Sequence, residues 1–336
     1  MKVINTINQV DSSEWRRVLA TSPTATFFQS EQCYRFYESL SFLRPFLYAV
    51  SEKDILKALV VGYIQQEKNG IKQFLTRRAI IPGGLLLADD VSDQVLTTLL
   101  TVCKTELRKK AIYIEIRNFN DYSTYREVFE KCGFRYLPHL NFHIDTSSEE
   151  TVLSNMGKSR KRDINTSLRN GAGFVDAPTR KDIEAYYQIL KHLYATRVKT
   201  PLFPFEFFDK LFTSGIGVYR LIYYKDEIIG GTLCVGLENR SLYEWFACGK
   251  DGVYKNIHPS TMATFAGIQY GARNGFPVFD MMGAGKPNED YGVRDFKSKF
   301  GGKLVENGRF VFVQKPLLFQ FGKTGVKLIK RISWFV

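Results

Sequence analysis

Hydrophobic and polar residues follow two periods along the chain, and these predict helices and strands in a definite order. Between Ser92 and Lys110 the apolar residues recur every three or four positions, as on one helix face, whereas Ile112, Ile114 and Ile116 alternate as in a strand. The same patterns predict further elements in the first half: helices at 11–19, 30–38, 92–110 and 122–132, and strands at 45–50, 55–65, 71–80, 112–116 and 140–145.

The second half repeats this order. It is predicted to contain helices at 148–169, 181–196, 204–212, 258–274 and 291–300, and strands at 174–177, 217–224, 228–237, 241–248, 277–281 and 303–314. In each half three antiparallel strands precede a helix, a parallel strand, a helix and a last strand. We therefore expect an α/β (α+β) protein of two lobes, residues 1–145 and 146–336, with mixed sheets flanked by helices.

The composition is typical of a folded protein with two cores. The 336 residues are 44% hydrophobic and 24% charged, and one domain usually takes about 100 to 200 residues. The longest apolar stretch, Ala79–Ala88, contains Pro82-Gly83-Gly84 and has about half the length that crosses a bilayer. Because the first residues form no apolar signal region, we expect a cytoplasmic protein, at most peripheral at the inner face of the membrane.

Cysteine and histidine spacing gives no sign of a metal centre or a disulfide framework. The five cysteines are scattered, and the four histidines include one pair, His139 and His143, without the ligand groupings of known zinc motifs. We expect buried thiols and structural histidines, with no metal and no cofactor.

The net charge of +13 is concentrated in two segments. Residues 291–336 hold ten Lys and Arg against Asp295 and Glu306, and residues 151–170 hold five against Asp163. Two local basic regions on an otherwise nearly neutral chain favour an anionic partner that carries phosphate.

Several segments resemble a known family. They are Thr26–Ser30 (TFFQS), Pro82-Gly83-Gly84, Leu153–Arg169, Ala195-Thr196-Arg197 and Gly292–Gly302 (GVRDFKSKFGG), of which the last is the most specific. Together with the repeated topology they resemble the tandem GNAT-like FemAB/FemX family of peptidoglycan interpeptide-bridge aminoacyltransferases, over about residues 5–315.

The resemblance implies an N-acyltransferase that moves an aminoacyl group from aminoacyl-tRNA to an amine of a peptidoglycan precursor peptide on a nucleotide or lipid carrier. The partners would be tRNA and that precursor. One alternative is an acyl-CoA-dependent GNAT-type enzyme of cell-envelope or glycan synthesis, although Gly249–Ile257 lacks the usual pyrophosphate-binding turn. A second alternative is a non-catalytic membrane- or RNA-binding module.

Two positions are the main candidates for catalysis. In the family the Phe-Lys pair, here Phe296-Lys297, lines the donor end of the active site, where an ammonium can stabilise a developing oxyanion. Asp280 ends the strand at 277–281, where it can orient the acceptor ammonium or take its proton. The structural alternatives are a solvated lysine and a strand-end cap.

Six further residues are candidates for substrate binding. Arg197 matches an acceptor-phosphate arginine of the family, and Tyr243 and Tyr254 offer rings for a uridine or peptide stem, with core packing as the alternative for Tyr243. The basic helix offers three cations for a polyanion: Lys158, Arg160 and Arg162.

The last segment, residues 315–336, has the pattern of a basic amphipathic helix. It suits either peripheral contact with an anionic bilayer or docking on the second lobe.

Overall fold

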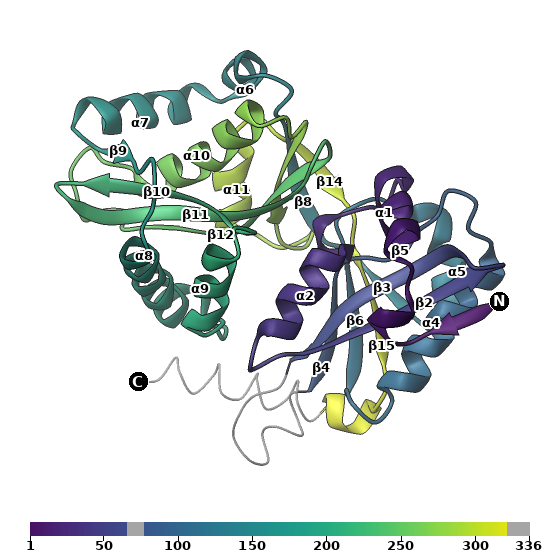
Figure 1. The fold of residues 1–336 in the computed structure, drawn as a ribbon. Helices are drawn as coiled ribbons and strands as arrows, with labels where there is room; N and C mark the ends of the chain where they lie inside the picture. Colours follow the sequence, from purple (N-terminus) through teal and green to yellow (C-terminus); the bar gives the residue numbers. More distant parts are fainter. Residues whose placement is uncertain (66–76, 321–336) are drawn as a thin grey trace. The chain divides into compact units, whose positions relative to one another are not determined.

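The structure of the protein is a computed structural model that describes residues 1–65 and 77–320. The chain folds into two compact units (Figure 1). Unit 1 contains Met1–Pro138 and the chain from Asn307 onward, and unit 2 contains His139–Glu306. The polypeptide therefore leaves unit 1 after Pro138 and returns to it at Asn307.

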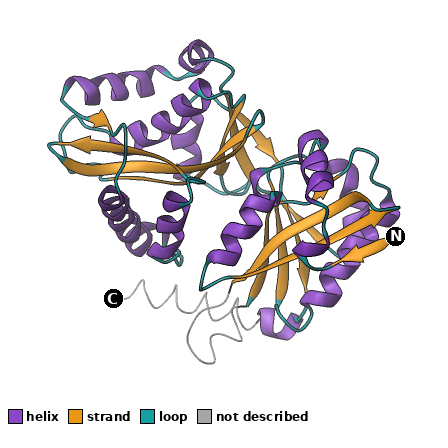
Figure 2. Cartoon of the chain, in the orientation of Figure 1, coloured by secondary structure: helices purple, strands orange, loops and turns teal. Residues whose placement is uncertain are grey.

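Unit 1 is a mixed sheet with helices on its faces (Figure 2). Its described strands run in the order β1-β2-β3-β4-β6-β15-β7, with β5 paired to β3, and β4 lies parallel to β6. The strands are β1 (Lys2–Ile4), β2 (Arg44–Glu52), β3 (Ile55–Gln65), β4 (Arg78–Gly83), β5 (Leu86–Leu87), β6 (Tyr113–Asn118), β7 (Arg135–Leu137) and β15 (Arg309–Val313).

Strand β3 is buried over nearly its whole length, which requires cover on both faces of the sheet. Val60 packs in the core that includes Leu96 and Leu100, and the neighbouring Val61 points to the opposite face. The described helices of unit 1 are α1 (Ser12–Thr21), α2 (Glu31–Ser39), α4 (Asp93–Leu107) and α5 (Arg126–Lys131), with 3-10 turns η1 (Ile7–Gln9), η2 (Phe27–Gln29) and η3 (Ser123–Tyr125).

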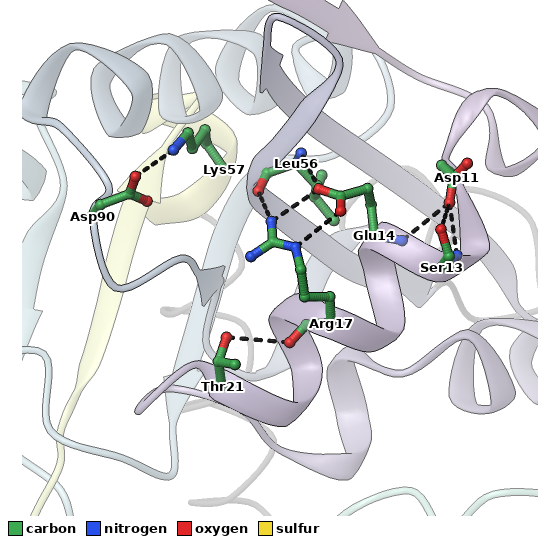
Figure 3. Close-up of polar contacts among 8 residues, drawn as sticks. All are labelled: Asp11, Ser13, Glu14, Arg17, Thr21, Leu56, Lys57 and Asp90. Atoms are coloured by element: carbon green, nitrogen blue, oxygen red, sulfur yellow. Dashed lines mark hydrogen bonds and ion pairs between the residues drawn. The ribbon is translucent and has the colours of Figure 1, made fainter.

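Helix α1 is fixed to β3 by polar contacts (Figure 3). Asp11 caps the helix by accepting from the backbone of Ser13 and Glu14. The Glu14 carboxylate accepts from the Leu56 backbone N–H at 3.2 Å, and Arg17 donates to the same Glu14 at 2.9 Å. The cap and the ion pair thus set where the helix begins and which strand it crosses.

Unit 2 is a second mixed sheet, in the order β14-β8-β13-β12-β11-β10-β9. In Figure 1, α8 and α9 cover one face, and α10 with α6, α7 and α11 covers the other. The strands are β8 (Leu140–Asp145), β9 (Gly173–Phe174), β10 (Val218–Tyr224), β11 (Glu227–Leu237), β12 (Ser241–Gly249), β13 (Val278–Gly283) and β14 (Lys303–Glu306). The helices are α6 (Glu149–Asn155), α7 (Lys158–Arg169), α8 (Arg180–Leu193), α9 (Phe205–Thr213), α10 (Pro259–Arg273) and α11 (Gly292–Ser298), with a π-helical turn η4 (Tyr194–Val198).

The predicted fold class is confirmed, but the strand assignment near the unit boundaries differs from the prediction. The strand expected over 303–314 is two strands: β14 pairs with β8 in unit 2, and β15 pairs with β6 and β7 in unit 1. Strand β8, expected to close the first lobe, pairs with β13 in unit 2. The expected division at residue 145 therefore differs from the observed one, because each unit takes its strand from across the predicted boundary.

The helix expected over 148–169 is also divided, into α6 and α7. The chain turns at Met156-Gly157, where the Gly157 backbone N–H donates to the Lys299 carbonyl at 3.0 Å. A Cβ on Gly157 would lie 2.9 Å from that same oxygen, so a close backbone contact and not propensity ends α6. The start of the strand expected over 71–80 lies outside the described residues, and the part that is described is β4.

All five cysteines are buried and free. Among residues 1–65 and 77–320, no cluster of His, Cys, Asp and Glu side chains has the arrangement of a metal site. Within the same residues, no helix combines the length and hydrophobicity needed to cross a bilayer. Most of the predicted amphipathic tail, from residue 321 onward, lies outside the described residues.

Candidate active site

The candidate site lies where two parallel strands of unit 2 separate. Strands β12 and β13 pair from Ser241/Val278 to Tyr243/Asp280, and beyond this point β12 remains paired with β11 as far as Gly249. Strand β13 instead bends away, with an irregular register against β8 between Asp280 and Gly283 and a positive φ of 54° at Met282. The separation frees backbone carbonyl groups of β13 at the carboxyl end of the parallel pair.

Lys297 of α11 supplies the hydrogen-bond donors for these carbonyl groups. Its Nζ donates to the carbonyl oxygens of Met281, Met282 (3.4 Å) and Gly283 (3.1 Å). Burial lowers the pKa of this ammonium, against the raising effect of the nearby Glu244 and Asp280 carboxylates. A half-buried cation therefore lies where β12 and β13 separate, whereas Lys299, just beyond the same helix, is exposed.

Two buried carboxylates accompany Lys297. Asp280 is 1% exposed, and its Oδ1 accepts from the Met282 backbone N–H at 2.6 Å. Glu244 of β12 follows the last residue that pairs with β13, and burial raises its pKa while Lys297 and a hydrogen bond from Thr264 of α10 oppose that rise. Its Oε1 has no hydrogen-bond partner among the described residues. A charged side chain within the apolar strand Ser241–Gly249 is the sequence signal that could have identified Glu244.

Asp280 also meets a histidine that the sequence analysis treated as structural. His143 of β8 is the register partner of Asp280, and its Nε2 lies 3.3 Å from Asp280 Oδ2. No sequence pattern links the two residues, because β8 and β13 are far apart along the chain.

The structure corrects the prediction that Arg160 binds a polyanion. Its guanidinium is buried, with its centre 4.3 Å from the Phe296 ring, and donates to the Phe296 carbonyl and to Thr261 Oγ1, each at 3.2 Å. Arg160 thus ties α7 to α10 and α11, and it holds the helix that carries Lys297.

The other predicted binding residues contribute no exposed group to this site. Tyr243 is the register partner of Asp280, but it is a core residue, 2% exposed. Tyr254 is partly exposed, and its hydroxyl donates to Glu227. Three further predicted residues are exposed: Arg197 on the π-helical turn, and Lys158 and Arg162 on α7.

Comparison with known proteins identifies the fold of the chain. No family model matches the chain, and no curated protein matches its sequence. Among solved structures, FemX superposes with a TM-score of 0.72 and 12% identity, over 96% of this chain and 99% of that one. A tandem GNAT protein from the clavulanic acid biosynthesis pathway superposes with a TM-score of 0.57 and 7% identity, over 93% and 99%. The chain has a tandem GNAT fold.

L-PGS from Bacillus licheniformis shares the tandem GNAT fold, with a TM-score of 0.55 and 12% identity, over 96% of this chain and 98% of that one. The predicted resemblance to FemX is thus confirmed for the fold. In this tandem GNAT fold the most specific motif, GVRDFKSKFGG, has a structural explanation: Gly301 has a φ of 83°, and a Cβ there would lie 2.1 Å from the Asn155 carbonyl oxygen.

Proposed function

We propose that this protein is an N-acyltransferase that transfers an aminoacyl group from aminoacyl-tRNA to an amine of a peptidoglycan precursor peptide. The observation that carries the proposal is the Lys297 ammonium, held at the separated ends of β12 and β13 between the carboxylates of Glu244 and Asp280.

This arrangement suits the aminolysis of an ester. The reaction needs a neutral amine close to the ester carbonyl and positive charge where the oxyanion develops. Lys297 supplies the charge in a poorly solvated place, where it acts more strongly than in water. Asp280 supplies a negative charge that attracts the acceptor ammonium.

Two features favour an aminoacyl donor over acyl-CoA. The first turn of α10 is occupied by a carboxylate, because the Ser260 N–H donates to Asp251 Oδ1 at 3.1 Å. A pyrophosphate at that helix N-terminus would meet this negative charge. Glu244 has one oxygen without a partner in the described part of the chain and offers a counter-charge for the α-ammonium of an aminoacyl group, a group that acyl-CoA lacks.

The exposed cations of α7 support a polyanionic donor. Lys158, Arg162 and Arg169 are exposed on this helix, whereas Arg160 is used internally. Such a surface binds a phosphate backbone without reading its sequence, which suits tRNA.

The test is transfer by the full chain. Purified protein would be given radiolabelled aminoacyl-tRNA with nucleotide-linked or lipid-linked precursor peptide, and acetyl-CoA in parallel, and products would be identified by mass. We expect an aminoacyl amide with the tRNA donor. Product formed only from acetyl-CoA, or no product from any donor, would contradict the proposal.

Lys297→Met should lower kcat by about 10²-fold, because it removes the positive charge proposed to stabilise the oxyanion. Lys299→Met is the matched control, because Lys299 is exposed and only two positions away. Thermal unfolding of both variants separates lost chemistry from lost folding. Equal turnover by the two variants would mean that Lys297 has no role in the reaction.

A further inference from the structure

Three polar side chains of unit 2 lie on one face of its sheet. Asn141 and His143 are two positions apart on β8, and Asp280 is the register partner of His143 on β13. The alternate residues Phe142 and Phe279 belong to the apolar core on the other face. The three polar side chains therefore face away from α10.

Each of the three carries a buried polar atom without a hydrogen-bond partner among the described residues: Asn141 Nδ2, His143 Nε2 and Asp280 Oδ2. Buried polar atoms are nearly always paired, so three such atoms on neighbouring strands need an explanation. The 3.3 Å between His143 Nε2 and Asp280 Oδ2 is an ion-pair distance, slightly longer than a typical N–H···O hydrogen bond. Loose catalytic hydrogen bonds of this kind are common before substrate binds.

Three charged residues lie next to His143 on its own strand and on the two strands paired with it. Asp280 flanks it on β13 and Lys303 on β14, and Asp145 is two positions away on its own strand. Tyr243 of β12 is the register partner of Asp280 on the next strand. The charge of Asp280 also raises the pKa of Lys297. Asp280 is buried and Lys303 is exposed, so the carboxylate is the less screened neighbour.

We propose that His143 is the proton acceptor for the acceptor amine, with Asp280 as the residue that orients its ring. This inference rests on the proposed function. Asp280 faces Nε2 and favours the tautomer with its proton there, which leaves the lone pair on Nδ1. The His143 side chain is 26% exposed while Nε2 is buried, so Nδ1 lies on the accessible side of the ring.

In the proposed reaction, proton transfer to His143 precedes attack of the amine on the ester. The acceptor ammonium gives one proton to His143 Nδ1, and the neutral amine attacks the ester carbonyl carbon. A C–N bond forms and the C–O bond to the tRNA ribose breaks. The second proton passes from the nitrogen to the leaving ribose oxygen, and His143 later releases its proton to solvent.

The kinetic test is the pH profile of His143→Gln. At pH 7 its kcat/KM should fall by about 10²-fold. The deficit should shrink by about tenfold for each pH unit above 7, because a free lysine-type acceptor amine, with a pKa of about 10.4, increasingly loses its proton unaided. His192→Gln, on the exposed surface of α8, is the control and should keep the wild-type profile. A deficit that stays constant with pH, or no deficit, would overturn the proposal.

A spectroscopic test works without turnover. Long-range ¹H–¹⁵N spectra of the full chain, with His143 assigned through the His143→Gln variant, report which ring nitrogen carries the proton. We expect the proton on Nε2, and a mixture of tautomers in Asp280→Asn. A proton on Nδ1 would overturn the relay whether or not the chain transfers aminoacyl groups. Absence of transfer by the wild-type chain would instead contradict the proposed function.

Discussion

At the scale of single residues, the site combines groups that are individually unfavourable in a protein interior. Glu244 is a buried carboxylate with one oxygen that has no partner within residues 1–65 and 77–320, and Lys297 is a half-buried ammonium. Lys297 lies between the two carboxyl groups, and Glu244 keeps one oxygen without a partner among the described residues, where a further cation can bind. An aminoacyl donor brings such a cation as its α-ammonium.

Donor preference tests this role of Glu244. The wild-type chain should use aminoacyl-tRNA in preference to N-acetylaminoacyl-tRNA, which has no α-ammonium. In Glu244→Gln the preference should fall by about tenfold or more, since a hydrogen bond to a charged group contributes about 1.5 to 3 kcal/mol. The measurement is kcat/KM for both donors with each protein. An unchanged preference in the variant would mean that Glu244 does not recognise the donor.

At the scale of elements, β15 is tied to β6 by charged groups as well as by strand pairing. Arg309 Nη1 donates to Glu115 Oε1 at 2.6 Å, and Arg117 Nε donates to the same oxygen at 3.1 Å. Burial raises the pKa of Glu115, but the two guanidinium groups outweigh it and bring that pKa to about 2. The ionised Glu115 thus stabilises the attachment of the last described strand.

This shift predicts a pH-dependent stability. Because the folded-state pKa is below the unfolded value of 4.5, the contribution of Glu115 is complete above about pH 4.5 and is lost as the pH falls toward 2. The full contribution is about 3 kcal/mol. Urea unfolding of wild type and Glu115→Gln should give free energies that differ most at pH 7 and converge only below about pH 2. Glu106→Gln, at an exposed position, is the control variant. A difference in unfolding free energy that does not narrow at low pH for Glu115→Gln would contradict the low pKa of Glu115 in the folded protein.

At the scale of the whole molecule, the chain crosses between its units twice, so unit 2 is one continuous segment whereas unit 1 is built from two separate segments. Unit 1 depends on β15, which lies between β6 and β7. Phe310 of β15 is fully buried and stacks on Phe129, with ring centroids 3.9 Å apart. Without β15, the facing edges of β6 and β7 lose their backbone partners.

Ending the chain after Glu306 should therefore unfold unit 1 and leave unit 2 folded, because all strands of the unit 2 sheet lie within His139–Glu306. Hydrogen exchange read by mass spectrometry should show protection lost in β2, β3 and β6 and retained in β11 and β12. A chain that ends after Gln320 keeps β15 and should remain protected in both units. Retained protection of β6 in the shorter chain would show that unit 1 folds without its last strand.

Local patterns along the chain were enough to predict most of the order of helices and strands, and the helix that carries Lys297. The period of apolar residues reports burial, and the Phe-Lys segment resembled a known motif, so both are properties of neighbouring residues. The same reasoning failed for Arg160, because a basic run on a helix looks the same whether a guanidinium meets solvent or two aromatic rings.

Strand partners and the composition of the site were decided by the tertiary structure. Alternation shows that 140–145 and 309–313 form strands, but backbone hydrogen bonds are the same for every sequence, so it does not say which sheet each joins. His143 and Asp280 come together only through the register of β8 and β13, and Glu244 comes near Lys297 only because β12 and β13 separate after Tyr243. Their chemistry depends on distances and burial between residues remote in sequence, and these arise only when the chain is folded.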